Sequence, residues 1–228
     1  MGHPTSLQQF IFGKLARGSG YRITAATTGL ADCESELLQI QGRYTLIGSQ
    51  ALRTVRAAGT FMVEDELVAV QATTSDTHEP PAFDAQGRPF VQHRYVFVPR
   101  AAAPNGYWRL TELVLRLAQQ PIPVYDDSLT ELEPLESKLL LPQPLSAEGR
   151  LSLMTQSLTL RDEKGRRLAL VVLEALLTGR RVLCSISDNF EEMSKLIDTA
   201  LGLLPAPYRT RFGLSLIHIS EPTRLRRI

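Results

Sequence analysis

The apolar positions in the first hundred residues recur mostly with the period-two spacing of β-strands. Segment 8–15 (QQFIFGKL) is followed, after the short loop ARGSG, by segment 20–27 (GYRITAAT), and together they predict an antiparallel hairpin. Segments 66–73 (ELVAVQAT) and 90–98 (FVQHRYVFV) predict two further strands that neighbour each other in a sheet. In the last segment the largely apolar face carries Val91, His93, Tyr95 and Phe97.

Two segments in the first half of the chain have patterns that are typical of helices. Segment 31–40 (ADCESELLQI) has acids early and leucines late, which predicts a short helix. Segment 107–120 predicts a longer helix, with Asn105 near its cap and Pro121 beyond its end. Its apolar stripe consists of Leu110, Leu113, Val114 and Leu117.

Proline and acidic residues are frequent in segment 121–150, and both resist regular packed structure, so this segment predicts a boundary. We therefore divide the chain into an N-terminal domain over 1–128, a linker over 129–149 and part of a middle domain over 150–213. The N-terminal domain is expected to be α+β, with a mainly antiparallel sheet and helices.

The middle unit shows a helix, strand and helix in succession, which predicts α/β layer packing. Segment 167–177 (RLALVVLEALL) is apolar on nearly every side, so we expect this helix to be buried between layers. Gly179 ends it, and segment 180–187 (RRVLCSIS) predicts a buried strand. A second helix follows over 188–204, where Asp188 and Glu191 resemble a capping box.

Composition places the chain among ordinary globular proteins, with 43% apolar and 21% charged residues. No apolar run is long enough to span a bilayer, and the first residues lack the order of a signal peptide, so we expect a cytoplasmic protein without a membrane partner. Cys33 and Cys184 lie far apart, which predicts reduced thiols and neither a disulfide framework nor a clustered metal site.

The last residues, 214–228, resemble the translation of a sequencing-library adapter, whose frame reads LSLIHISEPTR, and we expect them to be a non-native tail. The natural chain would then continue beyond about Gly213, and the present one would be truncated. Without this tail, the formal net charge falls from +1 to −1, because three arginines and one glutamate are lost. A basic surface for nucleic acid is therefore not expected.

Two glycines near the N-terminus have the spacing of a phosphate-binding loop but lack its lysine. Gly13 and Gly18 have phosphate-loop spacing, but Ser19 stands where a lysine would neutralise the phosphates. Segment 84–87 (DAQG) matches a short pattern common in GTPases. We interpret this segment as a turn between strands, because so short a pattern often arises by chance. We therefore expect no NTPase activity and no nucleotide cofactor.

Four histidines are too dispersed to predict a metal site, since none lie at ligand spacing on one helix; they are His3, His78, His93 and His218. His93 is expected to be a hydrogen-bonded core residue. Cys184 or Ser185 ends a predicted strand, where α/β enzymes often place nucleophiles, but no glycine elbow accompanies them. The favoured interpretation is a buried thiol in a core strand.

Arg180 and Arg181 have two interpretations. They are either solvated charges of a turn, which we favour, or groups that grip an acidic partner or a phosphate. They are the only candidate partner-binding residues that the pattern singles out.

Longer stretches resemble known families. Segment 168–212 (LALVVLEALLTGRRVLCSISDNFEEMSKLIDTALGLLPAPYRTRF) resembles the central module of DENN domains. Segment 8–30 (QQFIFGKLARGSGYRITAATTGL), with the later VFVPR and its following helix, is similar to the N-terminal domain of bacterial GTPase-associated proteins and compatible with a longin-like arrangement.

This resemblance implies a non-enzymatic regulator or adaptor that binds a GTPase, in a bacterial system of the conflict or defence type, and passes its nucleotide state to an effector protein. It carries over no catalytic residue and no cofactor. The competing hypothesis is a hydrolase or transferase that uses Cys184 or Ser185 as nucleophile with His93 as base.

Overall fold

The predicted strands pair into a seven-stranded sheet, whose order is β7-β3-β2-β6-β5-β4-β9. Every neighbouring pair is antiparallel except β3 and β7. The strands span Gln9–Gly13 (β2), Arg22–Thr27 (β3), Val55–Val63 (β4), Glu66–Thr74 (β5), Val91–Val98 (β6), Glu131–Leu132 (β7) and Leu214–Ile219 (β9). The hairpin β2–β3 and the neighbouring pair β5–β6 confirm the expectation from alternation.

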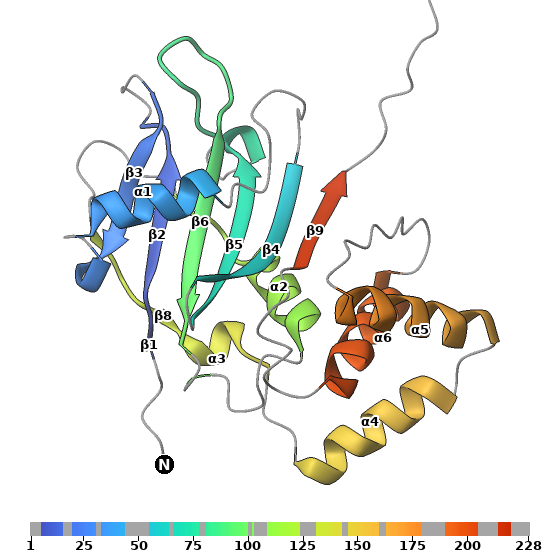
Figure 1. The fold of residues 1–228 in the computed structure, drawn as a ribbon. Helices are drawn as coiled ribbons and strands as arrows, with labels where there is room; N and C mark the ends of the chain where they lie inside the picture. Colours follow the sequence, from blue (N-terminus) through green and yellow to red (C-terminus); the bar gives the residue numbers. More distant parts are fainter. Residues whose placement is uncertain are drawn as a thin grey trace, which may run out of the picture.

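This computed structural model describes residues 6–15, 20–30, 33–43, 55–63, 66–77, 81–99, 102, 109–123, 131–142, 146–159, 163–178, 190–204 and 214–219. The chain is an α+β protein, as its sequence predicts, with helices on both faces of the sheet (Figure 1). Helix α1 (Glu34–Arg43) crosses one face, and α2 (Leu110–Gln119) packs on the other.

The face under α1 is lined by aromatic side chains. Phe10 of β2 lies opposite Tyr95 of β6, and their rings stack with centroids 4.5 Å apart and planes 4° apart. Phe97 and Leu37 complete the same buried cluster, which confirms the apolar face predicted for β6. Burying such side chains contributes about 1.5 to 3 kcal/mol each before chain entropy is subtracted.

The opposite face packs on the apolar stripe of α2. The four predicted stripe residues of α2 are all buried, together with Val96 and Val98 of β6. A proline at position 121 follows the helix, as expected, and Asn105 lies outside the described residues. Alternation on the strands and helical periodicity on α2 therefore fix which sides meet in the core.

Residues 131–140 of the expected linker contain regular structure. They contain β7, β8 (Leu135–Glu136) and the short helix α3 (Ser137–Leu140), and β8 pairs with β1 (Ser6–Leu7). The reason is that leucines recur among the acids, and Leu132, Leu135 and Leu140 are buried in the two cores on this side. The division into two domains stays a prediction.

Three helices gather beside α2 at one side of the sheet (Figure 1): α4 (Ala147–Thr159), α5 (Glu163–Leu177) and α6 (Phe190–Leu203). Helix α6 confirms the helix predicted over 188–204 where the structure describes it, and it buries Leu196, Ala200 and Leu201, with Leu204 just beyond its end. Leu201 and Leu204 belong to the same cluster as the stripe of α2, and Leu173 and Leu176 of α5 pack against it, so α5 and α6 contribute to a core shared with the sheet. The strand predicted over 180–187 and the capping box at Asp188 lie outside the described residues.

Candidate functional site

The structure places only some of the candidate residues. Arg180, Arg181, Cys184 and Ser185 lie outside the described residues, so a binding role for the arginines and a nucleophile at Cys184 or Ser185 stay predictions. Gly13 ends β2, where a side chain at this position would meet Cγ of Gln92 at 2.8 Å. This glycine is required by close packing of the sheet and not by a bound phosphate.

His93 is buried on the α1 face of β6 between aromatic rings. The ring centroids of Phe12 and Tyr95 lie 6.5 and 6.3 Å from its own. Desolvation lowers the pKa of His93 to about 4, so its imidazole is neutral at neutral pH. Within the described residues, neither ring nitrogen of His93 has a hydrogen-bond partner, so the prediction of a hydrogen-bonded histidine is wrong. The reason is that this position of β6 places the imidazole among aromatic rings and not among polar groups.

The DAQG segment forms a tight turn held by Asp84. Its Oδ1 accepts hydrogen bonds from the backbone N–H groups of Gln86 (3.0 Å) and Arg88 (2.9 Å), and Oδ2 forms ion pairs with Lys14 and Arg88. The backbone N–H of Arg88 contributes most to lowering the pKa of Asp84 to about 2. Gly87 takes the left-handed conformation with φ 71°, so these residues serve the turn.

A row of buried polar side chains lies on the α2 face of the sheet. Nε of Arg94 donates to Oε1 of Gln9 at 2.7 Å, and Nε2 of Gln9 donates to the carbonyl of Glu133 at 2.6 Å. Gln71 donates to the carbonyl of Gln120 at 2.7 Å. These hydrogen bonds hold the segments that follow α2 against the sheet. The buried polar side chains therefore have a structural role.

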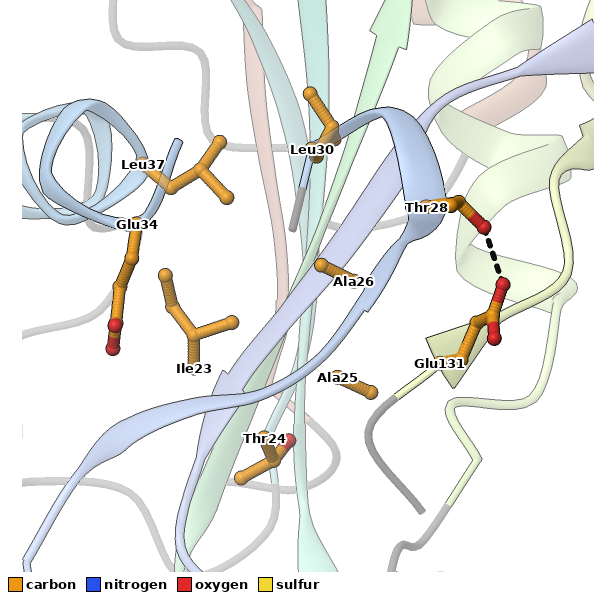
Figure 2. Close-up of a pocket in the computed structure, with 9 residues that line it drawn as sticks. All are labelled: Ile23, Thr24, Ala25, Ala26, Thr28, Leu30, Glu34, Leu37 and Glu131. Carbon is orange, nitrogen blue, oxygen red and sulfur yellow. Dashed lines mark hydrogen bonds between the residues drawn. The ribbon is translucent and has the colours of Figure 1, made fainter. Parts of the chain in front are cut away.

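A hollow of about 320 Å³ lies beside β3, between α1 and β7. It lies at a β-bulge, where β3 has the extra residue Thr24 opposite the step from Ile11 to Phe12 of β2. Figure 2 shows Glu34 of α1 on one side of β3 and Glu131 of β7 on the other. Thr28 donates a hydrogen bond to Glu131.

The lining of this hollow argues against a nucleotide. Its floor is apolar, and its two ionisable lining residues are both glutamates, so a phosphate would meet negative charge there. The described lining residues contain no histidine or cysteine that would act as a base or a nucleophile. The hollow is therefore a weak candidate for a catalytic or nucleotide-binding site.

Asp198 of α6 caps α2 across the helix interface. Its Oδ1 accepts a hydrogen bond from the backbone N–H of Thr111 at 3.1 Å, and its Oδ2 accepts one from the Thr111 hydroxyl. Arg109, at the N-cap position of α2, makes no side-chain cap. Burial raises the pKa of Asp198 to about 7, against the opposing effect of both bonds.

Sequence reasoning missed this cap because Asp198 and Thr111 are far apart in the chain. The sequence offered Asn105 near the cap of a helix over 107–120, whereas α2 begins at Leu110, where Arg109 at the N-cap position supplies no side-chain cap and leaves N–H groups for another segment to satisfy.

The outer helix face, which we define as Leu170, Val171 and Leu177 of α5, is the main exposed apolar feature. These side chains are 64%, 56% and 59% exposed. The opposite side of α5 packs toward α6 through Ala169 and Val172. The prediction that this helix is buried on all sides is therefore wrong, because α5 is a surface helix and only one of its sides packs on a neighbour.

Charged residues flank this face. Arg167 and Glu163 form an ion pair one helical turn before it, and Glu174 lies within it. On α4, which packs on α6, Leu151 is 67% exposed. Exposed apolar side chains with charges among them and beside them, here Glu174 and the Arg167–Glu163 pair, are typical of a protein-binding surface, and their exposure to water costs free energy. The all-apolar sequence of 168–173 was the signal that could have revealed it.

Comparison with protein-family models, with curated proteins and with solved structures finds no match to this chain. None of the helices in the described part of the chain has the length and hydropathy that a membrane span requires. Among the same residues, no three His, Cys, Asp or Glu side chains are placed to hold a metal ion.

Proposed function

We propose that this protein is a non-enzymatic regulator or adaptor that binds a GTPase through the outer helix face. The observation that carries the proposal is the exposure of Leu170, Val171 and Leu177 on a helix whose other side is packed. Apolar side chains at i, i+1 and i+7 form a stripe that a partner helix or sheet edge can cover. The class of partner comes from the resemblance to bacterial GTPase-associated proteins.

The sequence adds charge next to this face. Arg180 and Arg181 follow Leu177 by three and four residues, so they are proposed as polar contacts at the rim. The switch segments of a GTPase change with its nucleotide state, so a binding surface that reads them can distinguish the two states. Passing that state to an effector protein is the regulatory role that we propose. The longin-like and DENN-like assignments belong to the same proposal.

The enzyme hypothesis receives less support from the described residues. His93, its base, is buried between aromatic rings, and its low pKa makes it a weak proton acceptor. The carboxylate of Asp84 is engaged in a turn, and the polar side chains of Gln9 and Arg94 are engaged in contacts with the strands and the segments that follow α2. These observations favour a binding protein.

In the family that the chain resembles, the genes tend to neighbour a GTPase gene. The test therefore uses the full chain on a support and the GTPase that such a neighbouring gene would encode, loaded with GDP or with a non-hydrolysable GTP analogue. We expect retention to depend on the nucleotide and to be lost in the Leu170→Asp/Leu177→Asp variant. Leu38→Asp is the matched control, because Leu38 is an exposed leucine on α1, on the other face of the sheet. Equal and negligible retention in every nucleotide state would refute the proposal.

A further inference from the structure

The exposed side of α5 carries two charges at matching distances from the centre of the helix. Arg167 lies three residues before Leu170, Glu174 lies three residues after Val171, and both charged residues are exposed. Residues three and four apart share a side of a helix, so both charges lie beside the outer helix face. The centre of this face is therefore flanked by a cation toward the N-terminus and an anion toward the C-terminus.

The ion pair that Arg167 already makes leaves its guanidinium accessible. Arg167 pairs with Glu163 one turn earlier, and the two side chains are 77% and 72% exposed. Exposed pairs of this kind contribute at most about 1 kcal/mol, so they constrain their members little. A guanidinium has several N–H donors, and Arg167 can therefore bind a second carboxylate while it contacts Glu163.

The charges are complementary to themselves when two copies of α5 meet in opposite directions. A twofold axis between Leu170 and Val171 places Arg167 of one protomer opposite Glu174 of its partner, and the same pair recurs on the other side of the axis. In a parallel arrangement each charge would lie opposite its own copy, and like charges placed opposite each other oppose association. The charge pattern therefore favours an antiparallel pair.

The position of α5 leaves its exposed side open to a second copy. In Figure 1, α5 lies at the outer side of the helical group, and its packed side contacts α6. The apolar side chains of the outer helix face are more than half exposed. One helix face is smaller than the about 800 Å² per partner that stable interfaces bury, so the pair should be weak and reversible.

We propose that two copies of this protein pair through the outer helix face, with their α5 helices antiparallel and Arg167 of each protomer bound to Glu174 of its partner. The pairing itself does not depend on the proposed function. Its regulatory consequence rests on that function, because a GTPase that binds the same face has to displace the second copy. Self-association then lowers the apparent affinity for the GTPase as the protein concentration rises.

Sedimentation velocity of the full chain at increasing concentration, without any GTPase, measures the pairing. We expect the wild type to shift reversibly from monomer to dimer. Arg167→Glu and Glu174→Arg each place like charges opposite one another, so each should raise the dimer dissociation constant at least tenfold. The double variant Arg167→Glu/Glu174→Arg exchanges the two charges, restores both pairs and should return the constant close to the wild-type value.

The matched control is Lys138→Glu on α3. Lys138 is also an exposed cation in a surface ion pair, with Glu136, and it lies away from α5. This variant should dimerise like the wild type, because its charge change is the same and its position is outside the proposed contact.

A mixture of the two single variants separates lost pairing from a damaged helix. In a mixed dimer, the Arg167→Glu protomer meets the Glu174→Arg protomer with opposite charges at both contacts. Mixed dimers should therefore form at concentrations where each variant alone is monomeric. Failure of both the mixture and the double variant to dimerise would contradict the proposal.

Two further outcomes would overturn the pairing: a wild type that stays monomeric at every concentration, and a dimer that persists unchanged in both single variants. A monomeric wild type that retains the GTPase would refute the pairing and leave the proposed function intact. A dimer with the expected response to charge exchange that retains no GTPase would refute the proposed function and leave the pairing intact.

Discussion

The sheet and the helices α4 to α6 bury their apolar residues to very different extents. In the sheet, Phe10, Tyr95 and Val96 are fully buried, between α1 on one face and α2 on the other. On the helical side, α5 leaves Leu170 and Leu177 more than half exposed. Both regions are rich in large apolar side chains, so the difference lies in what covers them. The sheet uses them for stability, and α5 leaves them available to a partner.

The largest effect that separates the two regions is expected from truncation of a core ring. Phe10→Ala should lower the free energy of unfolding by about 3 to 5 kcal/mol, because it removes a fully buried ring that stacks on Tyr95. Leu170→Ala should change it by no more than about 0.5 kcal/mol, because this side chain faces water. Urea unfolding measures both, and similar losses at the two positions would break the comparison.

A smaller effect is expected from adding one methyl group. Gly13→Ala should cost about 1 to 3 kcal/mol, because the new Cβ would lie 2.8 Å from Cγ of Gln92 in the packed sheet. Gly42→Ala on α1 meets nothing within 4 Å and should stabilise the protein by up to about 1 kcal/mol. Thermal unfolding of the two variants checks the opposite signs, and a stabilised Gly13→Ala would show that the sheet is loosely packed there.

The pH dependence of stability should differ between the regions. His93 in the sheet has a pKa lowered to about 4, so its contribution is present above pH 6.5 and is lost as the pH falls toward 4. Asp198 in α6 has a pKa raised to about 7, so its contribution is present below about pH 4 and is lost as the pH rises toward 7. The two trends oppose each other between pH 4.5 and 6.5.

Replacing one of these two residues should leave the pH dependence of stability that the other one causes. In Asp198→Asn, the free energy of unfolding should rise from pH 4.5 to 6.5 by about 1 to 2 kcal/mol more than in the wild type. In His93→Phe, it should fall over the same range relative to the wild type. Urea titrations at the two pH values measure these differences, and parallel curves for all three proteins would show that neither group is buried as described.

Much of the sheet could be predicted from the sequence, because local patterns decide it. Alternation marked β2, β3, β5 and β6, and helical spacing marked α2. Strand β4 was missed because its Ala-Ala-Gly centre has low strand propensity, and pairing with β5 along eight residues overrides it. Helix α4 was missed because its apolar residues follow no clear stripe.

The functional surface was harder to predict than the fold. An apolar helix is compatible with burial on all sides or with one side awaiting a partner, and only the arrangement of neighbours decides. The pattern for α5 led to the first interpretation, whereas the structure leaves Leu170, Val171 and Leu177 exposed. The cap from Asp198 to Thr111 joins residues 87 positions apart, which no local pattern encodes.

The most direct test of the central claim compares binding with stability in one variant. For Leu170→Asp/Leu177→Asp, we expect the dissociation constant for the proposed partner GTPase to rise at least tenfold, which is about 1.4 kcal/mol. The free energy of unfolding should change by no more than about 0.5 kcal/mol. Unchanged affinity in this variant, with the fold intact, would contradict a binding role for the outer helix face.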